Sequence, residues 1–199
     1  MREKKVSRLT MAAMMGAVAF VLMYFSFSIP VLSPFAEFEF AALAELIGGF
    51  ILGPVGVFEI VGIKLLLKIV FKGTQSMMTG ELQNLILSVA FAMPAVLYYR
   101  RHRTKKAAVI GLLIGSAVNV VLAVLTSLYM IFPFYIKLYG MDWDALVGMC
   151  SAVNPWIKDI PTMVAFSVIP FNLIKCVVHS LITMLVYKKL SVPLKKLIK

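Results

Sequence analysis

The side chains with the most chemical potential lie near the C-terminal end, in the stretch Pro170-Phe-Asn-Leu-Ile-Lys175. A spacing of three residues places Asn172 and Lys175 on one face of a helix. Their surroundings are apolar, and a charged side chain inside a membrane span is costly unless it meets protein, water or a ligand. An amide and an ammonium together could hydrogen-bond a polar heteroaromatic ligand. Alternatively, Lys175 reaches toward the interface or pairs with a carboxylate such as Glu81.

Other polar residues interrupt apolar segments as well. Glu81 and Asn84 belong to Gly80-Glu-Leu-Gln-Asn84, and the positive end of a helix dipole explains a carboxylate in a first turn but not an amide one turn later. We therefore expect Asn84 to face a binding pocket. His179, one turn beyond Lys175, is predicted to be a packed, hydrogen-bonded histidine.

Two lysines of one segment, Lys64 and Lys68, lie four residues apart and so share a helix face. The predicted topology places them in the outer half of the membrane, against the usual preference for basic residues inside. They are expected to lie near the pocket or to pair with glutamates, and reaching toward the interface is the alternative.

Motifs for several kinds of catalysis are missing from the sequence. It contains no G-x-x-x-x-G-K-[ST] loop for nucleotide phosphates, no H-E-x-x-H pair and no G-x-S-x-G elbow. Cys150 and Cys176 lack C-x-x-C spacing and lie among apolar neighbours, which is typical of buried packing residues. The sequence predicts neither an enzyme nor a metal site, and it cannot use ATP by itself.

The composition identifies the environment of these residues. Of the 199 residues, 61% are hydrophobic and only 15% are charged, whereas soluble domains average about 25% charged residues. We therefore predict an integral membrane protein. The net charge of +11 comes from residues that flank apolar segments, and no interleaved basic and aromatic surface indicates a nucleic-acid partner.

A membrane span needs roughly 20 mostly apolar residues, or fewer where protein surrounds it. The predicted fold is all-α, one transmembrane substrate-binding domain over residues 1–199, built as a compact bundle of six transmembrane helices. The predicted spans are Leu9–Phe27, Phe40–Leu52, Val55–Phe71, Glu81–Tyr99, Ala107–Phe132 and Pro161–Tyr187. Gly53-Pro54 joins the second to the third with almost no loop.

Most of the 20 basic residues fall in three clusters, at residues 1–8, 100–106 and 188–199. Because cytoplasmic flanks carry the positive excess, six spans put all three clusters and both termini in the cytoplasm. Segments 29–39, 72–80 and 134–160 then face outward. Asn172 and Lys175 lie in the outer half of the last span.

The first span carries a stripe of small residues. Ala13 and Ala17 form a small-xxx-small pair with Gly16 beside them, and such a stripe allows another helix to approach closely in lipid. The approaching helix could belong to this chain or to a partner protein.

Together these motifs resemble those of a known family. Pro170–Lys175 looks like a P-F-N-x-I-K signature, and Gly80–Asn84 is similar to a G-E-L-x-N pattern. With the Gly53-Pro54 junction and the alanine stripe, the chain resembles the substrate-binding S components of energy-coupling factor (ECF) transporters, and among them the riboflavin-specific subunits, over essentially its whole length.

The resemblance implies a multi-pass subunit of the bacterial cell membrane that captures riboflavin from outside as a transported ligand and needs no cofactor. A transmembrane coupling subunit and two cytoplasmic ATPase subunits would drive delivery. Asn172 and Lys175 would contact the polar edge of the isoalloxazine ring. The other implied ligand contacts are Glu39, Phe40, Ala42, Ala44, Glu81, Asn84 and Ser127, while Ala13, Gly16 and Ala17 would meet the coupling subunit.

Two positions depart from the family pattern. Ala41-Ala42 replaces a frequent Ser-Asp pair, and Ser127 stands where an asparagine is frequent. A serine hydroxyl has a shorter reach, so a related flavin or an altered affinity is an open alternative. Two further alternatives are an S component for thiamine, folate or pantothenate, and a secondary transporter that works by itself through Lys175 and Glu81.

Overall fold

The computed structural model describes residues 2–74 and 76–196, with side chains described for residues 6–32, 36–74 and 76–187. Each of the six predicted spans lies mostly within a helical segment. The helical segments are α1 (Arg2–Tyr24), α2 (Ala41–Leu52), α3 (Pro54–Lys72), α4 (Thr79–His102), α5 (Lys105–Thr126) with η1 (Ser127–Ile131) and α6 (Phe132–Tyr139), and α8 (Ile160–Met163) with η2 (Val164–Val168) and α9 (Ile169–Lys196). A short helix, α7 (Trp143–Ser151), lies between the last two segments.

Length and composition divide these helices into two groups. Among the described residues, four are long and apolar enough to cross a membrane: Val6–Tyr24, Thr79–His102, Lys105–Tyr139 and Ile160–Tyr187. The apolar helix α2 is shorter, and α3 carries Glu59, Lys64 and Lys68 among its apolar residues. Each of these two helices buries one charged side chain, Glu45 of α2 and Lys64 of α3.

A two-stranded hairpin separates α1 from α2, and the all-α prediction missed it. Strands β1 (Phe27–Ile29) and β2 (Ser33–Phe38) pair antiparallel, with Phe27 opposite Phe38 and Ser28 opposite Glu37. The rings of Phe27 and Phe38 stack with centroids 5.2 Å apart, a cross-strand pair of the kind that stabilises a hairpin. The predicted first span to Phe27 therefore ends at Tyr24.

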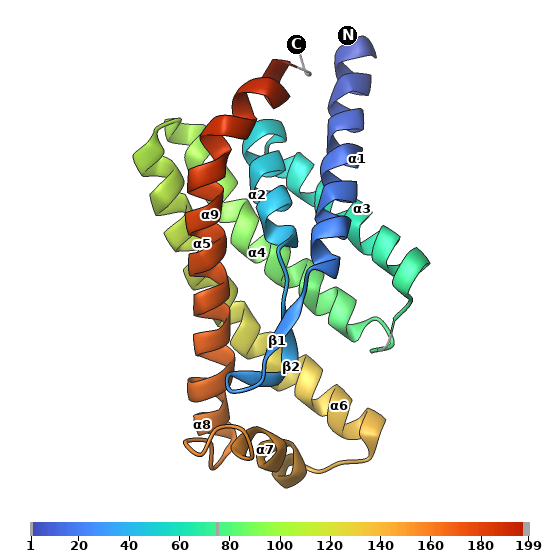
Figure 1. Ribbon diagram of the computed structural model, residues 1–199, viewed down its shortest axis with the longest axis vertical. Coiled ribbons are helices and arrows are strands. Elements are labelled where there is room, and N and C mark those ends of the chain that lie inside the picture. The colour runs from blue at the N-terminus through green and yellow to red at the C-terminus, as the bar shows by residue number, and fades with distance from the viewer. Residues whose placement is uncertain (1, 75, 197–199) are drawn as a thin grey trace.

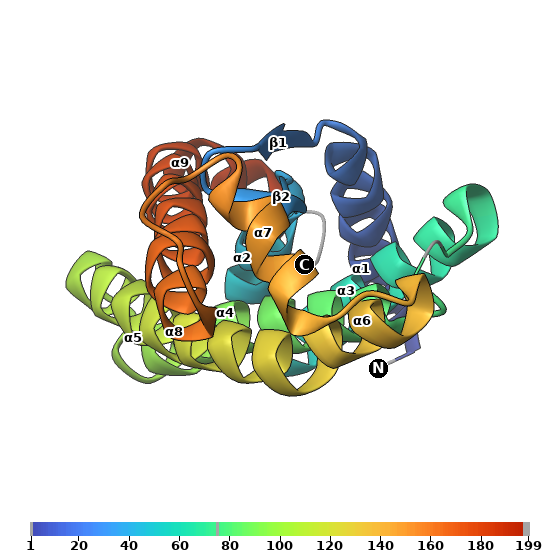
Figure 2. The ribbon, with the colours of Figure 1, turned by 90° about the horizontal axis from the view of Figure 1, so that it is seen from below.

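The end of the molecule that holds both termini also holds the connection between α4 and α5 (Figure 1). The backbone of the three basic segments is thus gathered at one end; Met1 and residues 197–199 lie outside the described residues. The hairpin, α6 and α7 lie toward the opposite end (Figure 1). There α7 contacts both β2 and α6 (Figure 2).

Helices α4 and α5 pack almost backbone to backbone. A Cβ atom added at Gly115 would lie 2.2 Å from the carbonyl oxygen of Phe91, and one at Gly111 would lie 2.8 Å from that of Ala95. Only glycine fits such contacts without moving a helix. This packing sets the distance between the two helices that carry Gln83 and Asn119.

The two longest helical segments each contain a π-helical turn, η1 and η2. In each, a proline follows the turn by two residues, Pro133 after Ile131 and Pro170 after Val168. Proline has no N–H to donate to the residue four positions before it, and a wider turn is one way in which a helix accommodates that loss. Both π-helical turns contribute residues to the cavity described next.

Candidate functional site

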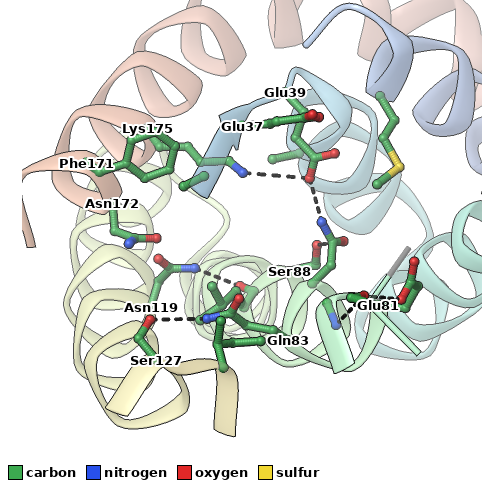
Figure 3. Close-up of a pocket in the computed structure, with 18 of the residues that line it drawn as sticks. Glu37, Glu39, Glu81, Gln83, Ser88, Asn119, Ser127, Phe171, Asn172 and Lys175 are labelled. Carbon is green, nitrogen blue, oxygen red and sulfur yellow. Dashed lines mark hydrogen bonds and ion pairs between the residues drawn. The ribbon is translucent and has the colours of Figure 1, made fainter. Parts of the chain in front are cut away.

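A cavity of about 350 Å³ opens between the hairpin, α3, α4, η1 with α6, and α9. Its volume falls in the range of about 300–1,000 Å³ that is usual for small-molecule sites. Its wall is rich in polar side chains, which surround a common space in Figure 3. The predicted residues Glu39, Ala42, Glu81, Asn84, Ser127, Asn172 and Lys175 all line it.

Lys175 lies at the cavity wall and forms an ion pair with Glu39, with 3.7 Å between Nζ and Oε1. Its side chain is 22% exposed and that of Glu39 is 8% exposed. Glu39 lies in the connection between β2 and α2. Burial alone would raise the pKa of this carboxyl, but the charges of Lys175 and Lys64 lower it to about 2. The carboxylate that Lys175 meets is therefore Glu39, and not Glu81 as the alternative reading proposed.

Two further contacts fix Glu39. The Asn84 amide donates from Nδ2 to Oε1 at 2.7 Å, and the His179 ring nitrogen Nε2 lies 2.8 Å from the backbone carbonyl oxygen of Glu39. His179 is buried, and its ring lies beside those of Phe38 and Phe91. The prediction of a packed, hydrogen-bonded histidine is confirmed, and this histidine also lines the cavity.

Asn172 lines the cavity, and one hydrogen bond fixes the orientation of its amide. Its Nδ2 donates to the carbonyl oxygen of Val168, in the π-helical turn η2, at 2.9 Å. The amide oxygen is then available to accept a hydrogen bond from a ligand. Asn172 and Lys175 lie on the same side of the cavity (Figure 3), as their spacing predicted.

Two amide side chains on the neighbouring wall, those of Gln83 and Asn119, were not predicted as site residues. The Gln83 amide donates to the Ser127 hydroxyl at 3.3 Å, and the Asn119 amide donates to the carbonyl oxygen of Leu87 at 2.8 Å. Both line the cavity. Their signal was present in the sequence, since Gln83 precedes Asn84 directly and Asn119 is an amide within an apolar span.

Glu81 lies at the edge of the cavity within its own cluster. Its carboxylate accepts hydrogen bonds from the Lys68 ammonium at 2.7 Å, the Thr74 hydroxyl at 3.0 Å and the Ser76 hydroxyl at 3.1 Å. These contacts hold the start of α4 to the end of α3. Lys68 thus pairs with a glutamate, as one of its predicted roles required.

Two of the predicted ligand contacts do not line the cavity. The Phe40 ring packs against the rings of Phe38 and His179, with centroids 5.6 and 6.3 Å apart. Ala44 is 2% exposed and lies in the core formed with α1. Phe40 precedes α2, which begins at Ala41. Within α2, Ala42 and Ala44 are two residues apart, and such residues do not share a helix face. Ala42 therefore faces the cavity while Ala44 faces the core.

The small-residue stripe of α1 divides between two faces. Ala13 and Ala17 are exposed, whereas Gly16 is buried against α3, where an added Cβ would lie 2.7 Å from Ile63 Cβ. Gly16 therefore packs inside the chain, which corrects its predicted place at a partner interface. The exposed part of the stripe is the Ala13 and Ala17 pair.

The chain is similar to known proteins over nearly its whole length. The model of the family "ECF transporter, substrate-specific component" matches residues 7–187. The riboflavin transporter RibU of Staphylococcus aureus (strain TCH60) is 28% identical, with 96% of this chain and 93% of that protein covered. The riboflavin transporter FmnP of Bacillus subtilis (strain 168) is 26% identical, with 94% and 93% covered.

The fold has a solved counterpart. A structure described as the S component of a bacterial ECF transporter superimposes with a TM-score of 0.73 at 28% identity, covering 96% of this chain and 99% of that one. The chain is a multi-pass bacterial membrane protein and a transporter component, not an enzyme. With a family match over nearly its whole length, the chain belongs to the substrate-specific components of ECF transporters.

Proposed function

We propose that this chain is the riboflavin-binding subunit of an ECF transporter, which captures the vitamin outside the cell. The observation that carries the proposal is the polar cavity that contains Asn172 and Lys175, in a chain similar over 94–96% of its length to two riboflavin transporters. Riboflavin is neutral overall and carries acceptors along one edge of a flat ring. An ammonium beside an amide oxygen suits such an edge.

The contacts that we propose for the ligand follow the cavity wall. Lys175 would donate to the ring acceptors, and the Asn172 oxygen would accept from a ring N–H. The Phe171 ring, which also lines the cavity, offers an apolar face. Further polar contacts would come from Glu39, Asn84, Glu81, Gln83, Asn119 and Ser127. Ala42 would leave space beside them.

We propose that the whole chain acts as one substrate-binding unit with six spans and that the end holding both termini is cytoplasmic. Positively charged segments favour that side, and three of them gather at this end. A transmembrane coupling subunit and two cytoplasmic ATPases would supply the energy. The exposed Ala13 and Ala17 on α1 would allow a helix of the coupling subunit to approach closely.

Flavin titration of the purified subunit in detergent tests this function. We expect saturable binding of riboflavin, read from the quenching of flavin fluorescence, and a yellow chromophore that purifies with the protein. Absence of binding, together with absence of flavin absorbance, would reject riboflavin as the ligand. Uptake by proteoliposomes that contain only this chain would instead favour an independent secondary transporter.

A further inference from the structure

An ion pair between two further buried side chains lies outside the cavity, behind its wall. Lys64 of α3 and Glu45 of α2 are 0% and 1% exposed, and Lys64 Nζ lies 2.5 Å from Glu45 Oε1. Neither side chain is among those that line the cavity. A buried charge in a membrane protein is costly, so this pair needs an explanation beyond the packing of two helices.

The Lys64 ammonium has three donors, and the structure gives each of them an acceptor. Besides Glu45, they are Asn84 Oδ1 at 2.6 Å and Ser88 Oγ at 3.2 Å, both on α4. The Ser88 hydroxyl in turn donates to Glu45 Oε1 at 3.2 Å. An ammonium can only donate, so whichever atom of Asn84 faces Lys64 must be the amide oxygen.

That constraint determines the other half of the Asn84 amide. With Oδ1 on Lys64, Nδ2 points to Glu39 Oε1, 2.7 Å away. The reversed amide would place its NH₂ group against an ammonium and its oxygen against a carboxylate, losing two hydrogen bonds to charged groups. Lys64 therefore fixes the orientation of Asn84, and Asn84 holds the Glu39 oxygen that lies 3.7 Å from Lys175.

We infer that Lys64 and Glu45 are positioning residues for the ligand site. Through Asn84 they hold the Glu39 carboxylate, and through Glu39 they set where the Lys175 ammonium lies before a ligand arrives. The inference rests on the proposed riboflavin-binding function and adds to it two residues that do not touch the ligand. Preset donors and acceptors raise affinity because less ordering is needed on binding.

A purely structural role for the pair makes a different prediction. Replacing both members of a buried ion pair by apolar residues of similar volume is often neutral or stabilising, whereas removing one member leaves an unpaired charge. The double variant Lys64→Met with Glu45→Leu should therefore fold, yet it removes the ammonium that holds the Asn84 amide oxygen and leaves that amide held mainly by Glu39. If the pair only stabilised the fold, this double variant would bind riboflavin like the wild type.

The test is riboflavin titration of the purified wild type and the double variant, with thermal unfolding measured on both. We expect the double variant to retain its unfolding temperature within a few degrees and to bind about tenfold or more weakly, since hydrogen bonds to charged groups are involved. The control is the more exposed ion pair of Arg8 and Glu59, 3.5 Å apart and outside the cavity. Arg8→Met with Glu59→Leu should keep wild-type affinity.

The measurements distinguish failure of the positioning role of Lys64 and Glu45 from failure of the proposed riboflavin binding. Wild-type binding together with an unaffected double variant overturns the positioning role alone. Failure of the wild type to bind riboflavin overturns the proposed function and the inference with it. Equal losses in the double variant and the Arg8 and Glu59 control also overturn the inference, because they indicate a general effect of removing charge.

Should the double variant fail to fold, Lys64→Met with Glu45→Gln takes its place. This variant also removes the donor to Asn84, while the amide at position 45 keeps the Ser88 hydroxyl as a partner. We expect riboflavin affinity to fall here as well. Wild-type affinity in a folded Lys64→Met with Glu45→Gln variant overturns the inference.

Discussion

The Lys175 side chain lines the cavity, and its ammonium also faces the buried carboxylate of Glu39. Its partner Glu39 is held by Asn84 and, through its backbone, by His179, so the ion pair has a fixed member and a more accessible one. The 3.7 Å separation is longer than a direct charged hydrogen bond of about 2.7–2.9 Å. The ammonium is therefore placed to donate to a ligand without leaving its countercharge.

Lys175→Ala should weaken riboflavin binding by about tenfold or more, because a hydrogen bond from a charged donor is lost. Titration of flavin fluorescence measures the change, and circular dichroism should show an intact helical fold. Lys158→Ala is the control, since Lys158 is exposed and lies away from this cavity. Unchanged affinity in Lys175→Ala would contradict the assignment.

The site residues that could be predicted from the sequence are polar side chains that interrupt an otherwise apolar span. Asn172, Lys175 and Asn84 interrupt apolar runs, and helical spacing was enough to place the first two together. The sequence did not identify Glu39 as the carboxylate that Lys175 meets, and Glu81 was named instead, because the pairing depends on how α2, α4 and α9 pack. The Lys64 and Glu45 contact depends on packing in the same way.

At the scale of elements, the close contact between α4 and α5 sets the width of the cavity on the side of Gln83 and Asn119. Gly115→Ala would press a methyl group against the backbone of Phe91, and we expect a loss of about 1–3 kcal/mol in unfolding free energy. Thermal or denaturant unfolding measures it. Gly148→Ala in α7 is the control, because its Cβ would meet nothing within 4 Å; an equal loss there would contradict the argument.

The exposed face of α1 carries a prediction about transport alone. Ala13→Trp should leave riboflavin binding by the isolated subunit unchanged and abolish uptake by the complete transporter, because a large ring prevents close helix approach. Uptake of labelled riboflavin by cells measures the effect. Val121→Trp, at an exposed position of α5, should retain uptake. Loss of binding in Ala13→Trp would mean that this face packs within the chain.

Elements that are not apolar helices were the least predictable. The hairpin β1–β2 was missed because Phe27 was assigned to the end of the first span and residues 29–39 were assigned to an outer connecting segment. Pro133 and Pro170 were visible in the sequence, but a proline can produce a kink, a break or a wider turn. Gly16 was assigned to the outer face because one small-residue stripe serves contacts within a chain and between chains equally well.

At the scale of the whole molecule, the distribution of charge predicts the orientation. We expect a cysteine at Lys158→Cys to react with a membrane-impermeant maleimide on intact cells, and one at Arg101→Cys to react only after permeabilisation. Both positions are exposed, and the background is a chain with Cys150 and Cys176 replaced by alanine. The reverse labelling pattern would contradict cytoplasmic termini.

The π-helical turn η2 has a consequence for insertions and deletions. Its hydrogen bonds reach five residues back, as from the Ile169 N–H to the Val164 carbonyl oxygen, so the turn holds one residue more than an α-helical turn. Deleting the exposed Phe166 should therefore leave an ordinary α-turn, with the segments before and after it still facing the same neighbours. A deletion within the α-helical part of α9 would instead rotate one side of the helix by about 100° and should be tolerated far less well.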